Sequence, residues 1–497
     1  MQSDDQAATI AFLANAGKDP QRIDTHISTV ILFENIVYKL KRAVKLPYLD
    51  FSTPQLRLAA CETEYSLNRR TAPVLYLGVR HITRQADGQL AFDGAGELAD
   101  AVVEMLPFAQ RDLFDTMARE GRLTGALLTR LARVIADFHA QAAQDFSRSG
   151  SHAVEAALEA NEGGFGEARI FDPLKVARLF NLCRARLELF HRSLDARGTA
   201  GKVRRVHGDL HLRNICLFKG EPVLFDCLEF SEDLGTTDVL YDVAFLLMDL
   251  VHRGLRYEAN LVFNRYIDET GDDETLALMP FFMAIRAAVR AHVGAASAGD
   301  DEAKAAEARD YLDLALELLG PHQPRLLAVS GLSGSGKSSV AAQIAARVDL
   351  APGARILSTD RIRKKLAGIG AEEKLPAEAY TQLSSARVYA EQRAQAARVL
   401  GGGWSVIADG VFLKPEEREA IEAVASTAHV RFAGLWLDAP REVLAARVAA
   451  RVNDPSDATV EVLNMQLVQS PGALHWHQVD ASGSLDECIE KVLQALA

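Results

Sequence analysis

The chain has 497 residues, of which 48% are hydrophobic and 25% are charged, and it carries a formal net charge of −12 at pH 7. This length predicts two or three domains, and the composition is that of an ordinary soluble globular protein. The acidic balance argues against non-specific binding to nucleic acid or to an anionic membrane surface.

The start of the chain contains Asp4 and Asp5 and no apolar core of a signal peptide. The longest apolar run, at 243–248, is far shorter than a membrane span. The five cysteines form no CxxC pair, as is usual in a reducing compartment. We therefore expect a cytoplasmic protein without a membrane partner.

The first 200 residues predict a small β-rich lobe followed by a large helical one. Strands are expected at 27–33, 36–41, 74–77 and 101–106. The first two are joined at Glu34 and Asn35, which indicates a hairpin. A helix is expected over 54–70 with Thr53 as its N-cap, and the segment 111–201 is almost wholly helical in pattern.

The stretch 207–214, HGDLHLRN, has the residue types that phosphoryl transfer requires. Asp209 and Asn214 are separated by four residues, as in the catalytic loop of kinases. In that chemistry one carboxylate takes the proton of the attacking hydroxyl, while an amide oxygen and a second carboxylate hold Mg²⁺. Asp226 ends the apolar strand 223–225, which would hold a metal ligand rigidly.

These residues resemble the aminoglycoside phosphotransferase and choline kinase group, relatives of protein kinases whose catalytic loop reads His-Gly-Asp-x-His-x-x-Asn. The match is complete at His207, Gly208, Asp209, His211 and Asn214. The resemblance covers about 20–315. It implies a bilobal kinase-like fold, with a small lobe over 20–105 and a helical lobe over 106–319. It also implies Asp209 as the catalytic base, and Asn214 and Asp226 as metal ligands.

The loop histidines and Asp209 also fit roles outside phosphoryl transfer. His207 and His211 are four residues apart and could form a zinc pair, but Gly208 and Asn214 disfavour the helix that such a pair needs. A structural role for His211 around the loop fits better. Asp209 could also be a turn residue, since Gly-Asp is common in turns.

The remaining parts of a kinase site have weaker signals. Lys39 on the third strand, with Val37 facing the adenine, fits the phosphate-pairing lysine better than Lys41 does. Glu64 is the candidate partner of that lysine, and Glu62 is the alternative. A solvated strand face and a surface glutamate would also account for these residues.

The segment 103–107 resembles the hinge between kinase lobes, with Glu104 as a nucleotide contact, although no Gly-x-Gly-x-x-Gly precedes Lys39. Glu229 is a candidate metal or substrate contact, as in choline kinases. Further charged residues are expected to cap or salt-bridge the helix around 243–250: Asp238, Asp242, Asp249, Arg286 and Arg290.

A small, polar stretch at 295–301 and an amphipathic helix over 303–319 lead to Gly320 and Pro321, where we place a domain boundary. The domains are thus predicted as 1–319 and 320–497.

Beyond the boundary, an apolar strand at 326–329 leads into GLSGSGKS at 331–338 and then into a helical segment at 340–346. This stretch has the P-loop pattern Gly-x-x-x-x-Gly-Lys-Ser. In a P-loop, backbone N–H groups surround the phosphates, the lysine reaches their oxygens and the serine ligates Mg²⁺. The expected nucleotide-binding residues are Gly331, Ser333, Gly334, Ser335, Gly336, Lys337, Ser338 and Ser339, with Ser338 also binding the metal.

Strands expected at 354–357, 405–408 and 430–437 alternate with helices and predict a parallel sheet, whose ligands gather at the strands' C-terminal ends. Three features lie at those ends. Asp360 with Arg361 and Arg363 suits deprotonation of a hydroxyl beside an anionic acceptor group. Asp409 lies where it would orient Mg²⁺, water or acceptor.

The third feature is a helix with Arg447 and Arg451 on one face, which could neutralise charge on the transferred phosphoryl group. Solvated, ion-paired helix faces are the alternative for both arginine-bearing segments. Together the features of 325–497 resemble small P-loop kinases of the gluconate, polynucleotide 5′-hydroxyl and zeta-toxin type. That resemblance implies Asp360 as acceptor base, and Arg447 and Arg451 as lid residues.

The joined arrangement resembles bacterial proteins described as bifunctional aminoglycoside phosphotransferase-like and ATP-binding proteins. We therefore expect a kinase with two nucleotide sites that uses ATP and Mg²⁺ to phosphorylate a small hydroxylated molecule, such as a sugar or amino sugar. One alternative is a regulatory protein in which one domain only binds nucleotide. Another is a toxin or nucleic-acid end kinase, which the basic segment 361–365 permits but the net charge does not favour.

Overall fold

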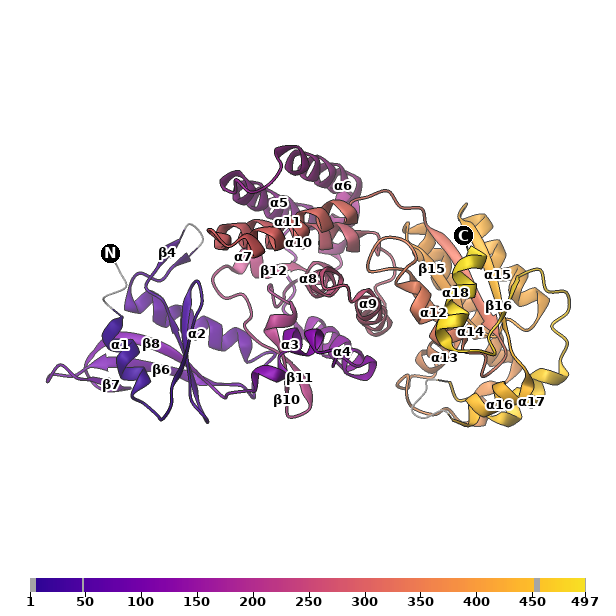
Figure 1. Cartoon of the computed structure of the whole chain (residues 1–497), viewed down its shortest axis with the longest axis horizontal. Helices are drawn as coiled ribbons and strands as arrows, with labels where there is room; N and C mark the ends of the chain where they lie inside the picture. The colour runs from indigo at the N-terminus through magenta and orange to yellow at the C-terminus, as the bar shows by residue number, and fades with distance from the viewer. Residues whose placement is uncertain (1–5, 47–48, 451–455, 497) are drawn as a thin grey trace. The chain divides into compact units, whose positions relative to one another are not determined.

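The structure is a computed structural model that describes residues 6–46, 49–450 and 456–496. Figure 1 shows its helices and strands along the chain. By internal contacts the chain divides into two compact units, Met1–Gly163 with Leu187–Asp249, and Gly164–Arg186 with Leu250–Ala497. The helices that follow Leu250 thus group with the P-loop sheet, whereas the sequence predicts a boundary after them, at residue 320.

An antiparallel six-stranded sheet forms the start of the first unit, in the order β1-β2-β3-β8-β6-β7. Its strands are β1 (Gln21–Asp24), β2 (Ser28–Leu32), β3 (Val37–Lys41), β6 (Tyr76–Arg84), β7 (Leu90–Phe92) and β8 (Glu97–Met105), and β4 (Lys45–Leu46) pairs separately with β5 (Leu49–Asp50). The predicted hairpin is confirmed, since Phe33 N donates to Ile36 O between β2 and β3.

Two helices supply core residues on opposite faces of this sheet. Leu13 of α1 (Ala7–Ala14) packs in one cluster with Leu40. Cys61 of α2 (Pro54–Asn68) packs in the other with Val37 and Val103. The Thr53 hydroxyl accepts a hydrogen bond from Leu56 N, which confirms the predicted N-cap of α2.

The helical stretch expected after residue 111 contains η1 (Gln110–Asp112), α3 (Phe114–Arg119), α4 (Gly125–Gln141), α5 (Gly150–Glu167) and α6 (Pro173–Thr199). Short strands then frame the predicted catalytic loop. They are β9 (Val203–Arg205), β10 (Ile215–Phe218), β11 (Glu221–Leu224) and β12 (Thr236–Asp238), with η2 (Leu212–Asn214), α7 (Glu232–Gly235) and α8 (Val239–His252) beside them in sequence. β10 pairs with β11, and β9 pairs with β12.

The second unit contains a parallel five-stranded sheet in the order β14-β15-β13-β16-β17, which confirms the predicted α/β fold of this part. The strands are β13 (Arg325–Gly331), β14 (Arg355–Ser358), β15 (Val406–Asp409), β16 (Arg431–Asp438) and β17 (His477–Asp480). The helices are α12 (Lys337–Ala345), α13 (Thr359–Leu366), α14 (Gln382–Gly401), α15 (Pro415–Thr427), α16 (Arg441–Ala449), α17 (Val460–Val468) and α18 (Leu485–Leu496), with η3 at Ala377–Tyr380.

Three helices that precede the P-loop in sequence belong to the same unit: α9 (Arg256–Thr270), α10 (Leu278–Ala298) and α11 (Glu302–Leu318). α9 binds the main chain around β14 through asparagines. Asn260 Nδ2 donates to Pro352 O (2.9 Å) and Ala354 O (3.1 Å), and Asn264 Oδ1 accepts from Ile356 N (2.7 Å).

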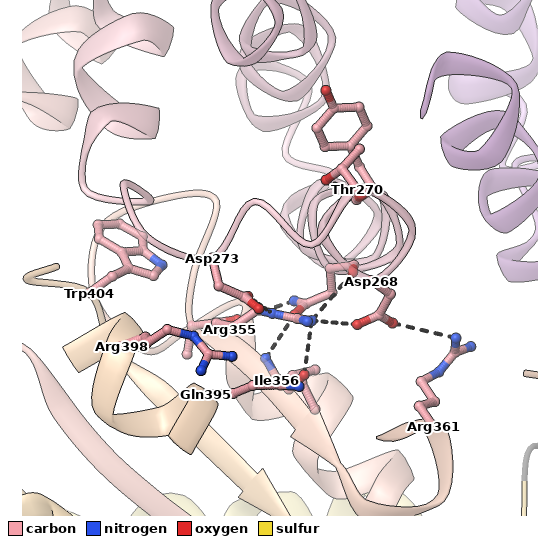
Figure 2. Close-up of polar contacts among 12 residues, drawn as sticks. Asp268, Thr270, Asp273, Arg355, Ile356, Arg361, Gln395, Arg398 and Trp404 are labelled. Atoms are coloured by element: carbon pink, nitrogen blue, oxygen red, sulfur yellow. Dashed lines mark hydrogen bonds and ion pairs between the residues drawn. The ribbon is translucent and has the colours of Figure 1, made fainter. Parts of the chain in front are cut away.

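Arg355 of β14 lies at the centre of the same contact (Figure 2). Its guanidinium is almost fully buried and donates from NH1 to Asp268 Oδ1 (2.7 Å) and from Nε to Asp273 Oδ1 (2.9 Å). The pKa of Asp268 is lowered from its usual range; burial alone would raise it, but Arg355, Arg265 and Arg361 stabilise the carboxylate. α9 and the following turn are therefore fixed to an edge strand of the P-loop sheet.

Among the residues that the structure describes, no helix is both long enough and apolar enough to span a bilayer. All five cysteines are buried and free.

Candidate active sites

In the first unit, Lys39 of β3 meets two acidic side chains from distant parts of the chain. Its Nζ lies 2.8 Å from Glu64 Oε1 of α2 and 2.5 Å from Asp226 Oδ1, beyond β11. The Glu64 side chain is fully buried, whereas that of Asp226 is 39% exposed. The structure thus brings the predicted pair Lys39 and Glu64 together with Asp226, a separately predicted metal ligand, and the accessible side of the cluster is at Asp226.

A second lysine, Lys41, lies on the same strand face because it is two residues further along β3. Its fully buried Nζ lies 2.5 Å from Glu64 Oε2 and contacts Glu229 Oε1. Burial alone would raise the pKa of Glu64, but Lys39 and Lys41 lower it to about 2. The Glu229 carboxylate, a predicted metal or substrate contact, is directed to Lys41 and is only 6% exposed.

The catalytic loop brings Asp209 and Asn214 into direct contact. Asn214 Nδ2 donates to Asp209 O (3.0 Å) and to Asp209 Oδ2 (2.9 Å). Phe225 N donates to Asn214 O (3.0 Å), which holds the residue before Asp226 against the loop. The amide nitrogen of Asn214 is therefore engaged by Asp209, and its other amide atom is an oxygen, the atom type that Mg²⁺ binds.

The two loop histidines make structural contacts within the first unit. His207 Nε2 lies 3.0 Å from Phe225 O, and His211 Nδ1 accepts from Arg213 N at 3.3 Å. Within the described ranges, no group of three or more His, Cys, Asp or Glu side chains is arranged to hold a metal ion. His211 Nε2 also lies 3.4 Å from Asp209 Oδ2, so His211 contacts the predicted base as well as the main chain of the loop.

α8 anchors this loop through two aspartates for which the sequence predicts a different role. Asp242 Oδ1 accepts from Gly208 N (2.8 Å) and Oδ2 accepts from His207 N (3.2 Å). Asp249, two turns later on α8, accepts from Leu212 N at 3.1 Å. Both acids thus accept hydrogen bonds from the main chain of the catalytic loop. The sequence predicts only that they cap or form salt bridges with their own helix. Their seven-residue spacing, which places them on one helix face, was the available signal.

Glu104 lies on the face of the sheet opposite to Lys39. It is the cross-strand neighbour of Tyr38, and its Oε1 lies 3.2 Å from Arg80 NH1. Since side chains alternate along a strand, the carboxylate points away from the face that carries Lys39. A nucleotide held by Lys39 could therefore meet Glu104 only through its main chain.

In the second unit, the P-loop connects β13 to α12, and two of its glycines lie too close to other main-chain atoms for a side chain. Gly331 has a φ of 139°, and a Cβ there would lie 2.5 Å from Leu437 O. Gly334 has a φ of 89°, and its Cβ would lie 2.4 Å from Leu444 O. Only glycine is accommodated at either position. Ser333 N donates to Gln466 Oε1 of α17 at 2.9 Å.

Lys337 and Ser338 begin α12 beside the end of β15. Ser338 Oγ donates to Asp409 Oδ2 at 2.8 Å. Asp409 is 2% exposed, and its Oδ1 has no hydrogen-bond partner among the described residues. Burial raises the pKa of Asp409, against the opposing effects of Lys337 and Ser338. A buried carboxylate oxygen without a donor is costly, so this pair fits a bound Mg²⁺, which prefers oxygen ligands.

Asp360 lies in the first turn of α13, directly after β14. Ser358 of β14 is the register partner of Asp409, so Asp360 follows at the same edge of the sheet as the Ser338–Asp409 pair. Arg361 is directed to α9, with NH1 3.4 Å from Asp268 Oδ2 (Figure 2). The predicted acceptor arginine is thus engaged by an acid from outside the P-loop motifs.

Arg363, the second predicted acceptor arginine, is turned to α14 and η3. Its NH1 donates to Ser384 Oγ at 3.1 Å, and its guanidinium lies over the Tyr380 ring, 4.8 Å from the centroid. Tyr380 and Ser384 lie beyond the end of α13, and Ser384 follows Arg363 by 21 residues. No local pattern in the sequence predicts this contact. Its predicted substrate contact stays a prediction.

A cavity of about 400 Å³ adjoins the P-loop, lined by 334–340, Arg447 and the segment 483–485 among others. Arg447 of α16 donates from NH1 to Ala481 O and from NH2 to Gly483 O, both at 2.8 Å. Its guanidinium thus fixes the loop after β17 as one wall of the cavity. The other predicted lid residue, Arg451, lies outside the described residues.

Comparisons with known proteins match two separate stretches of the chain. A model of the Phosphotransferase enzyme family matches residues 90–281, and a model of an AAA domain matches residues 326–469. Uncharacterized proteins of Mycobacterium tuberculosis and Mycobacterium bovis are each 30% identical over 479 residues, 94% of this chain and 93% of theirs. The chain belongs to the family of these mycobacterial proteins.

Solved structures are similar to parts of this chain. A choline/ethanolamine kinase family protein from Mesorhizobium loti is 14% identical with a TM-score of 0.40, over 65% of this chain and 96% of that one. A gluconokinase from Sinorhizobium meliloti is 24% identical with a TM-score of 0.25, over 35% and 91%.

This member of the mycobacterial family therefore carries a phosphotransferase domain and a P-loop kinase domain on one chain, which confirms the predicted resemblance. It is an ATP-dependent kinase. Asp209 contacts Asn214 in the first unit, and Asp360 follows at the same end of the sheet as the Ser338–Asp409 pair in the second. The anchoring roles of Lys41, Asp242 and Asp268 are seen only in the structure.

Proposed function

We propose that the protein has two separate phosphoryl-transfer centres, each of which uses ATP and Mg²⁺ to phosphorylate a hydroxyl group of a small cytoplasmic molecule such as a sugar or amino sugar. The observation that carries this proposal is that each compact unit has its own set of side chains for the reaction. The sets are Lys39, Glu64, Asp209, Asn214 and Asp226 in one unit, and Lys337, Ser338, Asp360 and Asp409 in the other.

In the first centre, Asp209 would take the proton of the attacking hydroxyl. The hydroxyl oxygen then bonds to the γ-phosphorus while the bond from that phosphorus to the bridging oxygen breaks, and ADP leaves. Lys39, held by Glu64, would bind phosphate oxygens, and Asn214 and Asp226 would hold the metal. Bound Mg²⁺ would neutralise part of the negative charge on the phosphates.

In the second centre, Lys337 and the P-loop main chain would bind the phosphates, and Ser338 with Asp409 would hold the metal. Asp360, at the same edge of the sheet, would take the proton of the acceptor. Arg447 would help to shape the nucleotide cavity through its bonds to the loop after β17.

Calorimetric titration of the full chain with a non-hydrolysable ATP analogue and Mg²⁺ tests the proposal. We expect two sites per chain, and one site in Lys337→Ala, because Lys337 is the only residue of the first turn of α12 that offers a positive charge to the phosphates. The matched control is Lys304→Ala, an exposed lysine of the same unit, which should retain both sites. A single site in the wild-type chain, lost entirely in Lys337→Ala, would contradict the proposal and favour a first unit that binds no nucleotide.

A further inference from the structure

The fully buried Lys41 has no role in the transfer chemistry described above. Its Nζ contacts only carboxylates in the described contacts of the first unit, Glu64 Oε2 at 2.5 Å and Glu229 Oε1, and its side chain is 0% exposed. The ring of Phe51 lies 5.6 Å from the ammonium. Because a charge removed from water is costly unless it is well matched, a lysine in this position calls for an explanation.

The two lysines of β3 hold one carboxylate from both sides. Lys39 Nζ lies 2.8 Å from Glu64 Oε1, and Lys41 Nζ lies 2.5 Å from Glu64 Oε2. The terminal torsion of a glutamate is soft and would by itself leave the carboxylate plane free to turn. With one lysine on each oxygen, rotation of the carboxylate would break an ion pair, so Oε1 stays directed to Lys39.

Lys41 also neutralises Glu229, an acid that would otherwise compete with Glu64 and Asp226 for Lys39. The cluster holds two lysines and three carboxylates, Glu64, Asp226 and Glu229, and only Asp226 is substantially exposed. Glu229 is 6% exposed and contacts Lys41. Without Lys41, the buried charge of Glu229 would have Lys39 as the other nearby ammonium, and Lys39 would be shared among three acids.

We infer that Lys41 is a positioning residue of the first centre: by holding Glu64 and Glu229, it keeps Lys39 directed to Asp226 and to the phosphates of the nucleotide. This inference rests on the proposal that the first unit binds ATP. It assigns Glu229 to the support of the lysine pair rather than to the metal or the acceptor.

The test uses the full chain with Lys337→Ala, so that only the first unit binds the probe, a non-hydrolysable ATP analogue with Mg²⁺, measured by calorimetry. Lys41→Met is expected to weaken binding by about 10- to 100-fold, the range found when residues that orient a metal ligand are removed. Lys41→Arg, which keeps the charge, should recover part of the affinity. Lys45→Met, which removes an exposed lysine paired with Asp50, is the control and should bind as the parent does.

A second variant separates positioning from stability. Lys41→Met/Glu229→Gln removes the Lys41–Glu229 pair and leaves Glu64 with Lys39 alone. Its melting temperature should return part of the way toward that of the parent, because the buried charge of Glu229 is gone. If Lys41 positions Glu64, nucleotide affinity stays low in this double variant. Recovery of affinity together with melting temperature would show that Lys41 only balances Glu229 and would overturn the inference, as would unchanged affinity in Lys41→Met.

The two proposals fail differently. Absence of any binding to the Lys337→Ala parent would overturn the two-centre proposal, and the inference with it. Binding to that parent with no loss in Lys41→Met overturns the inference alone.

Discussion

Replacing Asp209 by asparagine is expected to lower transfer at the first centre by about 10²- to 10⁴-fold, the usual contribution of a general base. Asparagine keeps the shape of the side chain and an oxygen that can accept from Asn214 Nδ2, but it cannot take the proton of the acceptor. The side chain is 39% exposed, so the melting temperature should change little. Product formation at the second centre should be unaffected.

The measurement uses γ-labelled ATP and a metabolite extract, with labelled products identified by mass spectrometry. Wild type, Asp209→Asn, Asp360→Asn and the double variant are compared at saturating ATP. Each single variant should lose one set of products and retain the other. If Asp209→Asn alone removed all transfer, the centres would be coupled or the P-loop unit would only regulate. If it removed none, the kinase-like interpretation of the first unit would be wrong.

The second large effect is expected on stability. Arg355→Met should lower the free energy of unfolding of the second unit by about 3–5 kcal/mol, because removing one partner of a buried ion pair leaves buried charge poorly compensated. Asp273 loses its ion pair with Arg355, and Asp268 keeps Arg265 and Arg361 but loses the arginine that stabilises its carboxylate most. Arg355 is 4% exposed, and its side chain bonds to both Asp268 and Asp273. Methionine fills a similar volume, so the loss reports mainly the charge.

Tryptophan fluorescence in a denaturant titration measures this effect selectively, since Trp404, Trp436 and Trp476 all lie in the second unit. The control is Arg309→Met, which removes an exposed arginine paired with Glu302 and should change stability by less than about 1 kcal/mol. Equal small shifts in both variants would mean that the acids around Arg355 are satisfied without it.

Local patterns predicted the parts of this molecule whose partners are near in sequence. The sequence predicts the P-loop between β13 and α12, because an apolar run, glycines and a helical segment follow one another within about 20 residues. The hairpin of β2 and β3 was found for the same reason. The sequence pattern does not predict β17, because His477–Asp480 contains one apolar residue, Val479, which is also the one residue of that strand that is buried.

Contacts between distant residues could not be read from sequence. Lys41 and Glu229 are 188 residues apart, and each was explained by its own neighbourhood, as a strand lysine and as a residue three beyond Asp226. The spacing of Lys39 and Lys41 did show that both share one face of a strand. It did not show that this face is buried, which depends on α2 and on the loop that carries Glu229.

The attachment of α9 to β14 affects where the P-loop part of the chain can be separated from the rest. A fragment that began at residue 320 would keep the P-loop, Asp360 and Asp409. It would lack the asparagines that bind the main chain around β14 and both acids that neutralise Arg355. A P-loop fragment cut at the boundary that the motifs suggest would therefore contain β14 with Arg355 but neither Asp268 nor Asp273, its two acidic partners. The partners that such a fragment would lose lie in α9 and the turn after it, inside the region that matches the phosphotransferase family.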